Sequence, residues 1–291
     1  MISLNKDYMI TFHNKNCFDV FKTVPDNSIK CIATDPPYAI SFSGQTSNTA
    51  WDNMDNDSYK KLLKDLFTEA KRVLTDDGTL WLCCARTKIP VVFEAIKDSG
   101  LNCNLENWMT YVRAKGRGAN TKLKSQCEEV LHITKTNKYQ FSSIEYLREC
   151  IVPYLKDGKP RGWFIDQNDG LRKRWSGIGN AMLFTSPFFK NKFESQIHST
   201  QKPFLLFVEL IMLSTKPGDT VMDPFAGSGS CGVAADCCGR NWIGCELDTD
   251  MYNKANNWVT NYDKDLAKEY FKSRVKYKSN EEQNELLNFI E

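Results

Sequence analysis

The 291-residue sequence has no long apolar run and no excess of charge of either sign. The segment from Met1 to Phe12 lacks the apolar stretch of a signal peptide, and no later run is long enough to cross a bilayer. We therefore expect a cytoplasmic protein with no membrane partner. The net charge of +2 neither indicates nor excludes nucleic acid, so local clusters of charge must decide.

Metal-ligand spacings are also missing. The eleven cysteines form no Cys-x-x-Cys pair, and the three histidines, His13, His132 and His198, are far apart in sequence. This pattern is not that of a disulfide scaffold or a zinc site. We expect reduced, buried thiols and no bound metal.

Short apolar runs alternate with amphipathic segments, a pattern that predicts an α/β fold with a parallel sheet covered by helices. The first unit comprises a strand at 29–34, a helix at 58–74 and, after an Asp-Asp-Gly turn, a strand at 79–84. The second unit comprises a helix at 203–213, a strand at 220–223, a helix after 227–232, a strand at 241–245 and a helix at 251–260.

A glycine loop lies between strand and helix in the second unit. The run Gly227-Ser228-Gly229-Ser230-Cys231-Gly232 matches G-x-G-x-x-G, with Glu246 roughly 20 residues further on. Taken alone, it is typical of a nicotinamide dehydrogenase. Asp223, however, ends the preceding strand, and a carboxylate there would repel a pyrophosphate but suit the ammonium of S-adenosylmethionine.

A second motif, Asp35-Pro36-Pro37-Tyr38, follows the first strand. Two successive prolines fix the backbone and remove two N–H donors, so the loop offers mainly acceptors. The Asp35 carboxylate and the Pro36 carbonyl could grip the two N–H bonds of an exocyclic base amine and direct its lone pair at a methyl donor. Tyr38 provides a flat surface for stacking an extruded base.

Together the two motifs resemble the DNA amino-methyltransferases, in the group where Asp-Pro-Pro-Tyr precedes Phe-x-Gly-x-Gly. A third matching segment is Ser199-Thr200-Gln201-Lys202-Pro203. The resemblance implies a Rossmann-like methyltransferase fold of permuted motif order, whose mostly parallel seven-stranded sheet has one antiparallel strand. It also implies an inserted target-recognition region.

The resemblance assigns site residues as well. Those implied to be catalytic are Asp35, Pro36, Pro37 and Tyr38. Those implied to bind the cofactor are Asn16, Asp35, Thr200, Lys202, Asp223, Phe225, Gly227, Gly229, Glu246 and Leu247. Of these, Glu246 would bind the ribose hydroxyls, Leu247 would lie against the adenine, and Thr200 and Lys202 would lie near the methionine carboxylate. Asn16 replaces the acid common in the family, which leaves its role open.

We expect four regions: a catalytic half at 1–137, a target-recognition insertion at 138–198, a cofactor-binding half at 199–262 and a helical extension at 263–291. Basic residues gather in and before the insertion, a composition suited to phosphate contacts. The residues expected to bind nucleic acid are Arg113, Lys115, Arg117, Lys122, Lys124, Arg172, Lys173 and Arg174.

The predicted activity is methylation of adenine N6 in a specific DNA sequence, with the base flipped out of the duplex. Within the family, Asp at position 35 favours adenine, while Ser is more usual in cytosine enzymes. Cytosine-N4 methylation, RNA adenine methylation, a dehydrogenase and a non-catalytic DNA-binding subunit remain alternatives. Two protein partners, a second copy of the chain and a companion restriction endonuclease, are raised by the resemblance, but the sequence is silent on both.

Overall fold

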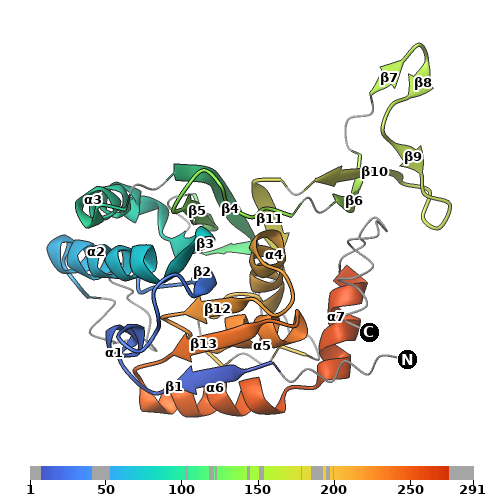
Figure 1. Cartoon of the computed structure of the whole chain (residues 1–291). Helices are drawn as coiled ribbons and strands as arrows, with labels where there is room; N and C mark the ends of the chain where they lie inside the picture. Colours follow the sequence, from blue (N-terminus) through green and yellow to red (C-terminus); the bar gives the residue numbers. More distant parts are fainter. Residues whose placement is uncertain are drawn as a thin grey trace.

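The protein is a layered α/β structure from which a small β arm projects (Figure 1). The computed structural model describes residues 8–40, 53–101, 104–117, 121, 123–142, 145–150, 154–177, 179–184, 193–194, 197–198 and 200–274.

The central sheet has the strand order β1-β13-β12-β2-β3-β5-β4-β11 in the described residues. In that order the strands are β1 (Ile10–His13), β13 (Asn241–Cys245), β12 (Thr220–Asp223), β2 (Ile29–Thr34), β3 (Leu74–Cys84), β5 (Ser125–Thr134), β4 (Asn104–Arg117) and β11 (Ala181–Phe184). β5 is antiparallel to both of its neighbours, and the other strands share one direction. The mostly parallel sheet with one antiparallel strand is thus confirmed, and β11 brings the strand count to eight rather than seven.

Helices cover both faces of this sheet. One face carries α1 (Cys17–Phe21), α2 (Asn56–Val73) and α3 (Ile89–Ser99), which follows the short 3₁₀ helix η1 (Arg86–Lys88), and the other carries α4 (Phe204–Ser214), α5 (Ser230–Cys237), α6 (Thr249–Asn261) and α7 (Lys264–Arg274). Successive strand residues point to opposite faces of the sheet. β3 therefore places Leu80 and Leu82 in the first core, under α1, α2 and α3, and Trp81 and Cys83 in the second core, under α4 to α7.

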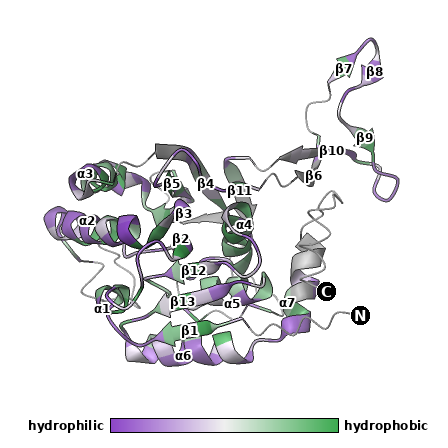
Figure 2. Ribbon diagram, in the orientation of Figure 1, coloured by the Kyte–Doolittle hydropathy of each residue, from purple (hydrophilic) through white to green (hydrophobic). Residues whose placement is uncertain are grey.

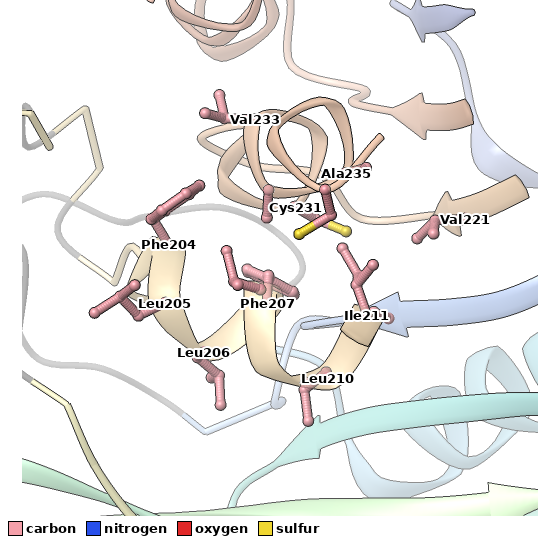
Figure 3. Packing of buried hydrophobic residues seen from close by; sticks show 14 of the residues in the cluster. Phe204, Leu205, Leu206, Phe207, Leu210, Ile211, Val221, Cys231, Val233 and Ala235 are labelled. Atoms are coloured by element: carbon pink, nitrogen blue, oxygen red, sulfur yellow. The ribbon is translucent and has the colours of Figure 1, made fainter. Parts of the chain in front are cut away.

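Helix α4 lies deepest in the second core. All of its side chains are buried, in agreement with a sequence that is apolar except for Glu209 and Ser214. In Figure 3, Phe207 and Ile211 point toward α5 and β12, while Leu206 and Leu210 point away from them. Figure 2 contrasts this hydrophobic helix with α2 and α6, where hydrophilic residues are abundant.

Strands β2 and β12 are direct neighbours although about 190 residues separate them in sequence. Val221 pairs with Cys31 and Met222 with Ile32. From this pair the chain proceeds outward in opposite directions, through α2 to β3 on one side and through α5 to β13 on the other. In open α/β sheets ligands bind at such a switch point, outside the carboxyl ends of the strands, and this is where Asp35 and Asp223 lie.

The projecting arm contains two small sheets. One consists of β6 (Glu145–Glu149), β10 (Arg172–Gly177) and β9 (Phe164–Ile165), and the other of β7 (Leu155–Lys156) and β8 (Lys159–Pro160). The β7–β8 turn is Asp157-Gly158 with φ of 53° and 72°, as expected for a two-residue hairpin. The arm falls within the predicted 138–198 insertion, whereas β11 from that same range joins the central sheet.

The elements of both predicted units are present. β2 and β13 have the predicted bounds, while β3 begins earlier than predicted because the strand passes through the expected Asp-Asp-Gly turn. In the extension predicted at 263–291, α7 is described to Arg274 and the remainder lies outside the described residues. The described cysteines are free thiols, and most are buried. Among the described helices, none has the length and apolarity needed to cross a membrane.

Candidate active site

The glycine loop connects β12 to α5 at the switch point. Gly227 and Gly229 both have positive φ, at 50° and 82°, which favours glycine. At Gly229 an added Cβ would lie 2.6 Å from Cγ2 of Val259, so close packing also requires glycine. At Gly227 the nearest atom to such a Cβ is 4.0 Å away, so the backbone there is open to a ligand. At Gly232 a Cβ would meet the ring of Trp242 at 2.8 Å, which explains the third glycine of the motif.

Asp223 lies at the base of this loop and is almost fully buried. Its Oδ1 accepts hydrogen bonds from the Thr34 hydroxyl at 2.7 Å and from the Phe225 amide at 3.2 Å. Desolvation raises the pKa of Asp223 to about 7, and these hydrogen bonds only partly oppose the shift. No Lys or Arg of the described residues pairs with this carboxylate. A ligand that carries an ammonium would supply the missing charge.

Glu246 follows β13 and faces the same loop. Its Oε2 accepts from the Gly227 amide at 3.1 Å and its Oε1 from the Asp248 amide at 2.8 Å. Each carboxylate oxygen can still accept a further hydrogen bond, as binding of a ribose diol requires. Leu247 is 48% exposed beside it, a large apolar surface suited to an aromatic ring.

The Asp-Pro-Pro-Tyr loop starts one residue beyond β2. The Tyr38 hydroxyl donates to Oδ1 of Asp35 at 2.6 Å. Desolvation raises the pKa of Asp35, although the Lys202 ammonium opposes this shift. Ala39 then adopts a φ of 50°, a conformation that non-glycine residues rarely take and that is often found at functional sites.

Lys202 is brought to this loop from the segment before α4. Its Nζ lies 2.6 Å from Oδ2 of Asp35 and 2.9 Å from Oε2 of Glu128, and 5.1 Å from the centre of the Tyr38 ring. The lysine, which was expected beside a cofactor carboxylate, forms an ion pair with Asp35 of the Asp-Pro-Pro-Tyr loop in the structure. Burial disfavours its charge, but the two carboxylates outweigh burial and raise its pKa.

Two charged residues of this site were not assigned to it from the sequence. Glu128 is on β5, and its Oε1 accepts from Nη1 of Arg113 at 3.0 Å. Arg113, expected to bind nucleic acid, is therefore directed into the site and also donates to the Ser125 carbonyl. The signal for Glu128 was weak, because nothing in a single sequence gives the register of β4 against β5.

The remaining residues predicted to bind the cofactor are Asn16, Thr200 and Phe225. The Asn16 side chain accepts from the Phe18 amide at 2.9 Å and so caps α1. Thr200 is exposed, and its hydroxyl lies 2.8 Å from Nδ1 of His198. Phe225 is partly buried and packs against the core under α1 and α2.

The other basic residues expected to bind nucleic acid are divided between the projecting arm and the β4–β5 strand pair with its connecting segment. Arg172 and Arg174 are exposed on β10, and Lys124 is exposed just before β5. Lys173 between them is instead held by ion pairs to Asp166, at 2.6 Å, and to Asp169. Lys115 and Arg117 are on β4. Lys122 lies outside the described residues.

These features define an α/β enzyme with an adenosine-cofactor cradle and an acceptor-rich loop on neighbouring strands of one switch point. Comparison with known proteins identifies the family. The family model for DNA methylase (N6_N4_Mtase) matches residues 29–257, and the chain belongs to this family.

Curated relatives agree with the family assignment. The chain is 28% identical over 278 residues to the type II methyltransferase M1.MboII of Moraxella bovis, covering 88% of this chain and 96% of that protein. It is 26% identical over 240 residues to the type II methyltransferase M.HpaI of Haemophilus parainfluenzae, covering 82% and 71%.

Solved structures share the fold. The M1.HpyAVI–SAM complex matches with a TM-score of 0.57 at 20% identity, covering 87% of this chain and all of that one. The PvuII DNA methyltransferase, described as cytosine-N4-specific, matches with a TM-score of 0.60 at 15% identity, covering 86% of each chain. The Rossmann-like methyltransferase fold is thereby confirmed.

Proposed function

We propose that this DNA methylase transfers a methyl group from S-adenosylmethionine to N6 of adenine in a specific DNA sequence. The observation that carries the proposal is the pairing of β2 with β12. It brings the Asp-Pro-Pro-Tyr loop, Asp35 to Tyr38, which we call the acceptor loop, beside the buried carboxylate of Asp223. A base amine held at the first group and a cofactor held at the second would meet at this switch point.

The residues of the glycine loop fit S-adenosylmethionine. The Asp223 carboxylate, which has no Lys or Arg partner in the described part of the chain, suits the ammonium. Glu246 suits the ribose diol, and Leu247 suits one face of the adenine. The open backbone at Gly227 allows close approach of the ligand. When bound, S-adenosylmethionine supplies an electrophilic methyl group. A dehydrogenase is disfavoured, because Asp223 would repel a pyrophosphate.

The acceptor loop would handle the amine and its proton. Asp35 and the Pro36 carbonyl hold the two N–H groups, which turns the nitrogen lone pair out of conjugation. Asp35 then accepts the proton released on methylation, and the raised pKa of this carboxyl favours that step. Rate enhancement comes from positioning and from fixed charges.

The choice of adenine rests on Asp35, the residue that favours adenine in the family this chain resembles. Cytosine N4 carries the same kind of amine, and the cytosine-specific PvuII enzyme has the same fold. RNA adenine is a further alternative substrate. Flipping of the base follows from the chemistry, since an exocyclic amine in a duplex is engaged in pairing.

The type II names of the relatives support a role in restriction and modification, with a companion endonuclease as a proposed partner. A second copy of the chain is a further proposed partner. The proposed place of action is the cytoplasm.

The test is to incubate the protein with unmethylated genomic DNA and S-adenosylmethionine, digest the DNA to nucleosides and identify the product by mass spectrometry. N6-methyladenine is expected, and Asp35→Ala should abolish it. N4-methylcytosine, or equal activity of the variant, would refute the assignment. A parallel incubation with RNA and titrations with NAD separate the remaining alternatives.

A further inference from the structure

Glu128 reaches the acceptor loop because of the pleat of β5. Glu128 and Val130 lie on the face covered by α4, and Leu131 lies on the face covered by α2 and α3. Glu129 shares that opposite face, where it binds Arg86 and the indole of Trp108. Two adjacent glutamates thus have separate surroundings, and only Glu128 contacts the site.

Around Glu128 two carboxylates and two cations alternate. Arg113 pairs with Glu128, Glu128 with Lys202, and Lys202 with Asp35. The four formal charges cancel, and all four side chains are at most 21% exposed. Burial opposes the charge of Glu128, but Lys202 and Arg113 outweigh it and lower the pKa of this carboxyl.

We propose that Glu128 is a positioning residue that serves as the standing counter-ion of Lys202, so that Asp35 is free to change its partners and its protonation state during methyl transfer. The inference rests on the proposed function. In the structure both oxygens of Asp35 are engaged, one by the Tyr38 hydroxyl and one by Lys202.

The geometry gives each of these groups a second acceptor on Glu128. Oε2 of Glu128 lies 2.9 Å from Lys202 Nζ and 3.3 Å from the Tyr38 hydroxyl. When Asp35 turns to a base amine or takes up its proton, Lys202 keeps one ion pair, and Tyr38 can donate to Glu128. Without Glu128, protonation of Asp35 would leave a buried ammonium unpaired, which is strongly unfavourable.

Glu128 also tunes the acceptor itself. Its negative charge raises the pKa of Asp35, in opposition to Lys202. Replacing Glu128 by a neutral residue should therefore lower the pKa of Asp35 and make it a weaker base. Replacing Arg113 by a neutral residue removes a nearby positive charge and should act in the opposite direction.

The experiment measures kcat against pH at saturating DNA and cofactor. Glu128→Gln should lower kcat on the order of ten- to a hundredfold and move the acid limb of the profile to lower pH. Its cofactor Kd should stay close to that of the unaltered protein. Arg113→Gln should move the acid limb to higher pH.

Glu129→Gln is the matched control, because it removes an adjacent buried carboxylate from the opposite face. It should reduce thermal stability but leave the acid limb in place. If Glu128→Gln does not fold by circular dichroism, the Arg113→Gln profile carries the test, with Glu128→Asp expected to restore part of kcat.

An unmoved acid limb in both variants, or movement in the same direction, would overturn the inference. A shift in Glu129→Gln equal to that in Glu128→Gln would overturn it as well. A wild-type protein without Asp35-dependent methylation would refute the proposed function and this inference together. The two failures are thus distinguished by the activity of the unaltered protein.

Discussion

The hydroxyl of Thr34 donates a 2.7 Å hydrogen bond to the carboxylate of Asp223 and thereby joins the last residues of β2 and β12. Thr34 directly precedes the acceptor loop, and Asp223 directly precedes the glycine loop. One side-chain hydrogen bond therefore links the two strand ends from which both loops of the site begin.

Cofactor affinity should depend on pH through Asp223. Because the pKa of this carboxyl is raised to about 7, the ammonium of S-adenosylmethionine should bind more weakly as the pH falls from 8 to 6, and binding should release a proton. Calorimetry in buffers of different ionisation enthalpy measures both effects. Thr34→Val should raise the pKa further and move the midpoint upward. A Kd that is flat across this range would contradict the prediction.

Asp223→Asn should separate stability from binding. A buried carboxyl with a raised pKa favours the folded state at pH below about 4, and this contribution is lost as the pH rises through about 7. At pH 8 without cofactor, the variant should therefore melt at a higher temperature than the unaltered protein, while at pH 5 the difference should shrink. Its affinity for S-adenosylmethionine should fall. Equal melting temperatures at both pH values would show that Asp223 is not an uncompensated charge.

Gly229→Ala should destabilise the protein by roughly 2–4 kcal/mol, because the new methyl group meets Val259 and the left-handed backbone disfavours alanine. Urea denaturation measures the change. Val259→Ala in the same chain should recover the part due to crowding. Gly158→Ala, where φ is also positive but no atom lies within 4 Å, should cost only about 1 kcal/mol.

Arg172 and Arg174 should contribute to DNA affinity in a salt-dependent way. Replacing either by alanine should reduce the slope of log Kd against log salt by about 1, since each removes one expected phosphate contact. Lys173→Ala should change the slope less, because Asp166 and Asp169 already bind this ammonium. Fluorescence anisotropy at several salt concentrations compares the three variants. A larger effect from Lys173 than from the arginines would reverse this interpretation of the arm.

Much of the fold could be predicted because its central strands are short runs of mainly apolar or β-branched residues. β2 and β13 were delimited correctly from such runs, and the helices beside them from their spacing. β4 was not predicted as a strand, since its polar and basic residues have the composition of a phosphate-binding loop. The long β4–β5 pair became evident only from tertiary structure.

The chemistry of the site was predictable as motifs but not as ion pairs. Arg113 and Lys202 were expected to face ligands, and the structure shows that both form ion pairs with Glu128, a partner the sequence did not reveal. The sequence position of a charged residue does not show which residue it will pair with in the fold. The register of the strands and the burial of the side chain decide whether a Lys or Arg can bind phosphate or is already paired with a carboxylate of the protein.

The pairing of β2 with β12 also constrains how the chain folds during synthesis. The ribosome releases β2 early, yet the strand that completes its inner edge emerges about 190 residues later, which at 5–20 residues per second is roughly 10–40 s. The interval between the synthesis of β1 and that of its neighbour β13 is longer still. The part of the nascent chain that contains β2 therefore exposes an apolar strand edge over that interval, and such an edge is open to pairing with other chains.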